Sequence, residues 1–161
     1  MKHIMVALMF LTVLAATIPA DATNLDIGKS ITIGSGPKTV IEFTDPDCPF
    51  CRKASKYFEG RSDVTRHVFF YPLPRHPKAK EKAQYILSQM DQATAYREVM
   101  SGKMDSFTKI EGITQKGIKL QEEQFETARR QKVNSTPTFL INGRIIVGFD
   151  QKKIEDALGS K

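Results

Sequence analysis

Both cysteines of the chain lie in the segment Cys48-Pro49-Phe50-Cys51. If a helix begins here, the two thiols lie side by side, one helical turn apart. Cys48 is then at the helix N-terminus, where free backbone N–H groups and the helix dipole favour a thiolate. The thiolate is the attacking species in disulfide exchange. The spacing therefore predicts a redox pair, with Cys48 as the nucleophile and Cys51 as the resolving thiol.

Two alternatives to a redox pair are a structural disulfide and a metal site. Pro49 and Phe50 form the dipeptide between the two cysteines. Pro49 suits the first position of a helix, because the N–H that proline lacks would have no partner within the helix there. A purely structural disulfide across this short loop would stabilise the fold by only about 2 kcal/mol. A metal site needs more ligands, and neither His67 nor His76 has ligand spacing to the cysteines. We favour the redox pair, and we expect no metal and no cofactor.

Residues 1–22 are typical of a secretory signal peptide. A short basic start precedes the apolar run Ile4–Ile18, and small residues follow in Pro19-Ala20-Asp21-Ala22. The run has about 15 residues, fewer than the roughly 20 of a membrane-spanning helix. We therefore expect cleavage after Ala22 rather than an uncleaved anchor. The mature domain, residues 23–161, is then periplasmic, without stable membrane insertion, in a compartment where disulfides persist.

The formal net charge of the chain is +6. A basic surface can attract nucleic acid. Here the basic residues are scattered among acidic ones, as in Lys78-Ala79-Lys80-Glu81-Lys82, which is typical of a solvated helix face. No glycine-rich phosphate loop and no aromatic-basic RNA motif occurs. We expect no nucleic-acid partner.

A strand, a helix and a second strand must position the cysteines. Residues 39–44 are β-branched and apolar, as in a buried strand. The apolar residues of the following helix share one face, and Gly60 ends it. A second strand over 64–71 completes a βαβ unit. Before this unit, residues 25–33 alternate like a short strand or hairpin.

Helical spacing dominates the middle of the chain. It runs over residues 79–90 and can extend to residues 96–100, and a further helix is predicted over residues 121–132. These segments form a helical insertion at about 78–132. The insertion separates the βαβ half from a C-terminal ββα half.

A hairpin and a last helix end the chain. Strands over 138–141 and 144–147 flank Asn142-Gly143, which supplies the positive φ angles of a type I′ turn. Asp150 can cap a final helix. The order of elements predicts an α/β fold.

The segment Phe43–Cys51 resembles the active-site segment of the bacterial periplasmic disulfide isomerases of the DsbC/DsbG type. The resemblance continues through Val68–Pro74. It ends in Ser135–Phe139, which looks like the cis-proline loop of the thioredoxin superfamily, and it covers roughly residues 39–158. It implies a thioredoxin-like fold with a helical insertion, and a Cys48–Cys51 disulfide that forms and breaks during the reaction.

The resemblance also implies roles for residues outside the pair. Thr136-Pro137 is expected to carry a cis peptide bond against Cys48 and to expose the backbone of Thr136 to an extended substrate. Glu42 matches the position of a buried acid in thioredoxins. Such an acid can accept the proton of Cys51 as that thiol attacks. The alternative is an edge position, where Glu42 is solvated.

The isomerases carry an N-terminal dimerisation domain, for which the segment between Ala22 and Thr39 is short. We therefore expect a monomeric thiol–disulfide oxidoreductase. Its partners would be cysteine-containing exported proteins and a membrane or periplasmic redox partner. The direction of electron flow depends on the reduction potential. The alternative function is a peptide-binding module of the same fold with a structural, non-catalytic disulfide.

Overall fold

The computed structural model describes residues 25–159, and the predicted signal peptide lies outside this range. A five-stranded sheet has the strand order β1-β3-β2-β4-β5. Its strands are β1 (Ile31–Ile33), β2 (Lys38–Thr44), β3 (Val64–Phe70), β4 (Thr138–Ile141) and β5 (Arg144–Val147). Strands β2 and β3 are parallel, and the other neighbours are antiparallel. The helices are α1 (Pro49–Glu59), α2 (Ala79–Ser88), α3 (Gln92–Met100), α4 (Gln115–Arg130) and α5 (Gln151–Leu158).

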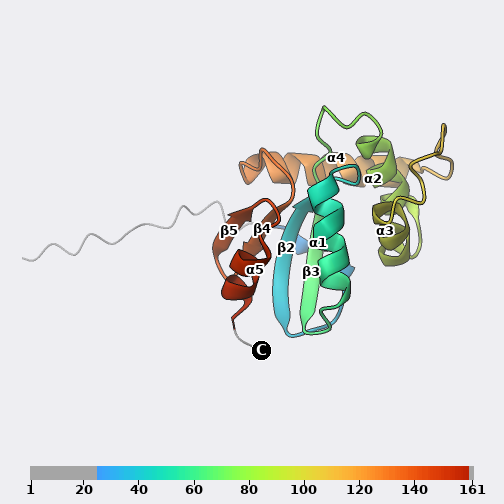
Figure 1. The fold of residues 1–161 in the computed structure, drawn as a ribbon. Helices are drawn as coiled ribbons and strands as arrows, with labels where there is room; N and C mark the ends of the chain where they lie inside the picture. The colour runs from blue at the N-terminus through green and yellow to red at the C-terminus, as the bar shows by residue number, and fades with distance from the viewer. Residues whose placement is uncertain (1–24, 160–161) are drawn as a thin grey trace, which may run out of the picture.

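Helices cover both faces of the sheet (Figure 1). Successive strand residues point to opposite faces. On one face, Val40 of β2 packs with Ala54 of α1 and Ile154 of α5. On the other face, the neighbouring Phe43 packs with Ala128 of α4. Strand β2 is thus central and buried on both sides, and its C-terminal end leads directly into the cysteine segment.

The βαβ unit has the predicted order. Helix α1 buries Cys51, Ala54, Ser55 and Phe58, which lie on one side of the helix. Gly60 follows as its C-cap, and β3 begins at Val64. Because α1 lies across β2, the start of the helix is held at the end of the central strand.

Three helices form the insertion between β3 and β4, which confirms the predicted α/β fold. The helical pattern does not form one long helix, however. Asp91 begins α3 as its N-cap, and its side chain accepts a hydrogen bond from the backbone N–H of Thr94 at 2.9 Å. Helix α4 starts at Gln115 rather than at the predicted residue 121, because Thr114 caps it by accepting from the N–H of Gly117.

The C-terminal hairpin follows the predicted turn chemistry. Asn142 and Gly143 have φ angles of 48° and 77°, and Asp150 accepts a hydrogen bond from the N–H of Lys153 as the cap of α5. The segment before β2 forms no hairpin of its own. It makes a 3₁₀ turn, Ile27–Lys29, and then β1, which pairs antiparallel with β3. No helix within residues 25–159 is long and apolar enough to cross a membrane.

Candidate active site

Cys48 is the N-cap residue of helix α1. Its backbone is extended, with φ −77° and ψ 121°, and Pro49 occupies the first turn. No side chain caps the helix, so its first N–H groups remain available to the Cys48 sulfur. The backbone N–H of Cys48 donates to the carbonyl oxygen of Asp45 at 3.1 Å, which closes the turn between β2 and α1.

Asp45 holds this turn in place. Its carboxylate is fully buried and accepts hydrogen bonds from the backbone N–H of Asp47 at 2.7 Å and of Leu73 at 2.7 Å. The same carboxylate lies 2.9 Å from Nδ1 of His76. The loop after β3 is thereby tied to the loop that carries Cys48.

The two thiols differ in their ionisation. The two cysteines are not joined by a disulfide, and Cys48 is 2% and Cys51 0% exposed. A hydrogen bond from the Cys51 thiol, helped by the backbone N–H groups of Cys51 and Phe50, lowers the pKa of Cys48 to about 5 despite burial. Burial raises the pKa of Cys51, and the hydrogen bond to Cys48 and the negative charge there add to this rise. Cys48 is therefore the thiolate at neutral pH and Cys51 the protonated thiol.

The loop that contains Thr136 and Pro137 lies against the sulfur of Cys48. The Sγ atom of Cys48 is 3.5 Å from the carbonyl oxygen of Thr136, and the Thr136–Pro137 peptide bond is cis. The carbonyl oxygen of Pro137 accepts from the N–H of Gly148 at 2.8 Å, which ties the loop to the end of β5. Residues far apart in the sequence thus meet at one sulfur atom.

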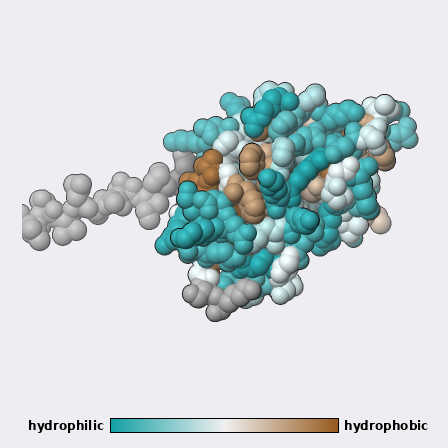
Figure 2. Space-filling model, in the orientation of Figure 1, coloured by the Kyte–Doolittle hydropathy of each residue, from teal (hydrophilic) through white to brown (hydrophobic). Residues whose placement is uncertain are grey.

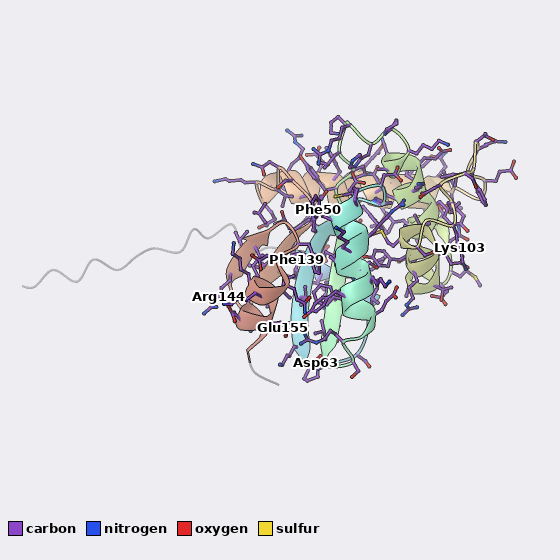
Figure 3. The ribbon with its side chains drawn as sticks, viewed as in Figure 1. Phe50, Asp63, Lys103, Phe139, Arg144 and Glu155 are labelled. Atoms are coloured by element: carbon purple, nitrogen blue, oxygen red, sulfur yellow. The ribbon has the colours of Figure 1, made fainter. Side chains whose placement is uncertain are left out.

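Phe50 marks the exposed part of the site. Its side chain is 56% exposed, at the upper end of α1 in Figure 3. The face drawn in Figure 2 is mostly hydrophilic, with a small hydrophobic group near the start of α1 and the β4–β5 hairpin. An apolar surface beside a thiolate suits contact with an unfolded or extended polypeptide.

Glu42 lies on the central strand, so the solvated edge position is wrong. The side chain is 0% exposed, and its Oε2 lies 3.0 Å from Nη1 of Arg66. Its Oε1 has no hydrogen-bond partner among the described residues. Along β2 it is two residues from Thr44, roughly 7 Å, on the same side of the sheet. The hydroxyl of Thr44 is also buried and has no hydrogen-bond partner among the described residues.

Arg66 is a site residue that the sequence interpretation missed. Its guanidinium is buried between the rings of Phe58 and Tyr96, 5.1 and 5.3 Å from their centroids. The alternation of residues along β3 could have predicted that Arg66 is buried. Val64, Arg66 and Val68 alternate on one side of β3, so a charged residue there must be buried with a partner.

The comparisons with known proteins agree with this geometry. The family model of the thioredoxin-like domain matches residues 29–159. The chain belongs to this thioredoxin-like family. A crystal structure of a disulfide interchange protein from Neisseria gonorrhoeae has a TM-score of 0.70 and 29% identity, over 84% of this chain and 100% of that chain. The catalytic domain of Proteus mirabilis ScsC shares the fold with a TM-score of 0.64, at 21% identity, over 86% of this chain and 91% of that one.

A curated relative points the same way. The probable thiol:disulfide interchange protein DsbC of Bordetella parapertussis is 26% identical over 85 residues, which is 53% of this chain and 30% of the relative. This chain therefore matches less than a third of the length of that relative. Within residues 25–159 of this thioredoxin-like domain, no group of three or more His, Cys, Asp or Glu residues could hold a metal ion.

Proposed function

We propose that this protein is a thiol–disulfide oxidoreductase that acts through Cys48 and Cys51. The lowered pKa of Cys48 beside the buried, protonated Cys51 carries the proposal. A structural disulfide needs neither a thiolate nor a difference between its two sulfurs. The thioredoxin-like family and the named disulfide interchange relatives support the same activity.

The reductive direction illustrates the chemistry. The Cys48 thiolate attacks one sulfur of a substrate disulfide, a bond forms between them, and the other substrate sulfur leaves as a thiolate. Cys51 then loses its proton and attacks Sγ of Cys48. The substrate's second sulfur leaves, the Cys48–Cys51 disulfide forms, and two electrons have passed to the substrate. Oxidation of a substrate dithiol is the reverse sequence, and a redox partner must restore the pair in either case.

Substrate binding and proton transfer fall to the neighbouring residues. The backbone of Thr136 beside Pro137 would pair with an extended substrate segment, and the exposed ring of Phe50 would contact it. Glu42 would accept the proton of Cys51, through Thr44 or a water molecule because of its distance along the strand. The motivation is the buried carboxylate oxygen of Glu42 that has no partner among the described residues.

The setting of this activity is also a proposal. We propose that the chain is exported after cleavage at Ala22, acts as a monomer on cysteine-containing periplasmic proteins, and is restored by a membrane or periplasmic redox partner. Sedimentation at micromolar concentration should give the mass of one chain. A stable dimer would instead support an isomerase that holds its substrate between two subunits.

Trapping of mixed disulfides tests the activity. A Cys51→Ala variant should accumulate substrate bound to Cys48 on non-reducing gels, and a Cys48→Ala variant should not. Cys48→Ala should also abolish dithiothreitol-driven reduction of insulin. If both thiols titrate as ordinary cysteines and nothing is trapped, the peptide-binding module with an inert disulfide is the better description.

A further inference from the structure

Four charged side chains form a cluster beside the active-site turn: Asp47, Arg52, Lys82 and Asp105. We call them the ionic cluster. Asp47 immediately precedes Cys48, and Arg52 lies in the first turn of α1. Lys82 belongs to α2, and Asp105 lies in the segment after α3. The cluster therefore joins the catalytic loop to the helical insertion.

The contacts within the ionic cluster are close. Nζ of Lys82 lies 2.5 Å from Oδ1 of Asp47 and 2.6 Å from Oδ1 of Asp105. Arg52 donates to both carboxylate oxygens of Asp105, at 2.6 and 2.7 Å. It also donates to Oδ1 of Asp47 at 3.2 Å and to the carbonyl oxygen of Pro46 at 2.8 Å. Two cations thus converge on one oxygen of Asp47.

Burial makes these charges effective. The Lys82 side chain is only 2% exposed, and that of Asp47 is 18% exposed. Water and salt screen such a pair less than they screen a surface pair. A carboxylate next to a thiolate disfavours the thiolate by repulsion, unless cations offset its charge. Asp47 would therefore oppose the chemistry of Cys48 if it stood alone.

We propose that Lys82 and Arg52 are positioning residues that offset the charge of Asp47 beside the Cys48 thiolate, so that the helical insertion sets the redox balance of the active site. This inference rests on the proposed function. It gives the insertion a chemical role, because Lys82 is supplied by α2 and is held there by Asp105.

The other charges around the turn have their own partners. Asp45 accepts hydrogen bonds from two backbone N–H groups and lies 2.9 Å from Nδ1 of His76. Behind the pair, Glu42 is bound to Arg66. Removal of either cation, Lys82 or Arg52, therefore leaves an acidic excess next to Cys48.

A charge-balance series tests the proposal. The measured quantities are the pKa of Cys48, from thiolate absorbance against pH, and the equilibrium constant with glutathione. Lys82→Met should raise the pKa of Cys48 by about one unit. It should also lower, about tenfold, the equilibrium constant for reduction of the Cys48–Cys51 disulfide by glutathione. Asp47→Asn should shift both quantities in the opposite direction. The Asp47→Asn/Lys82→Met double variant, with the charge balance restored, should return close to the unsubstituted protein.

Two matched variants complete the series. Lys80→Met removes the same charge from an exposed position of the same helix and should leave both quantities unchanged. Lys82→Arg keeps the charge and should retain them. If Lys82→Met and Asp47→Asn change the free energy of unfolding but neither quantity, the ionic cluster is purely structural and the proposal is wrong. If the unsubstituted protein does not exchange with glutathione, the proposed function fails instead.

Discussion

The thiols of Cys48 and Cys51 differ chemically although they lie within one turn of the same helix. The difference is mutual, because the Cys51 thiol donates to the Cys48 sulfur, and the charge formed there opposes ionisation of Cys51. We predict that the rate of alkylation of Cys48 by iodoacetamide rises with pH around a midpoint near 5. A Cys51→Ala variant loses the main hydrogen bond, so its midpoint should move up toward that of an ordinary cysteine. A midpoint near pH 8.5 in the unsubstituted protein would contradict the assignment.

A second residue-level prediction concerns Glu42. Glu42→Gln keeps the size of the side chain and removes the base, so it should slow release of substrate from the mixed disulfide. Formation of the Cys48 thiolate should change little. Single-turnover kinetics on both variants separates attack from release. An unchanged release rate across neutral pH would return Glu42 to a purely structural role.

The same substitution has a consequence for stability. Glu42→Gln leaves the buried guanidinium of Arg66 without its counter-charge, so we expect a loss of about 3 kcal/mol in the free energy of unfolding. A Glu42→Gln/Arg66→Met double variant should recover most of that loss, because both charges are then gone. Urea unfolding of the two variants measures the coupling. Additive losses would show that the pair does not act as a unit.

Asp91 caps the start of α3 after the break that follows α2. The carboxylate of Asp91 accepts from the backbone N–H of Thr94 and also from its hydroxyl. Asp91→Ala should cost about 1 kcal/mol in the free energy of unfolding, and Asp91→Ser, which can still cap the helix, should cost less. Chemical denaturation measures both. Equal losses for the two variants would mean that the cap is not the cause.

The sequence predicted well those features of the fold that depend on one or two adjacent residues. Asn142-Gly143 predicted the hairpin, and Gly60 the end of α1. The continuous helical spacing of residues 79–100 hid the break at Asp91, because a cap requires one side chain and leaves the apolar periodicity intact. The early start of α4 at Gln115 was missed for the same reason.

The candidate site was predictable in part. The pair Cys48 and Cys51 is local in the sequence, and the resemblance predicted the loop at Pro137. The Arg66 partner of Glu42 and the ionic cluster join residues from different elements. No spacing rule connects Lys82 with Asp105 or Asp47, so these contacts required the folded chain.

The candidate active site is assembled from the ends of several elements. Strand β2 leads into the turn at Asp45, α1 and its N-cap supply the cysteines, and the loop before β4 supplies Thr136. The insertion adds Lys82 through its contact with Asp47. Ionisation of the pair is therefore coupled to folding, because the unfolded chain lacks all of these contacts.

This coupling predicts how pH changes the stability of the reduced protein. Folding lowers the pKa of Cys48 to about 5, so the thiolate contributes stability that is lost as pH falls through 5 and is complete only above the pKa of an unfolded cysteine, about 8.5. Folding raises the pKa of Cys51. Above about pH 8.5 the unfolded chain therefore gains a thiolate that the folded protein does not form, and stability falls again.

The two cysteines should thus contribute most to the stability of the reduced protein near pH 8.5. We expect the free energy of unfolding to rise by at least about 1 kcal/mol between pH 5 and pH 8, because the Cys48 thiolate forms in the folded protein over this range and does not form in the unfolded chain. Urea unfolding of the reduced form and of the Cys48–Cys51 disulfide form at each pH measures it. The difference between the two forms isolates the cysteines, because the other titrating groups are common to both. A difference that stays flat from pH 5 to pH 8 would mean that Cys48 is not a stabilised thiolate, and that the nucleophile must be activated by the substrate instead.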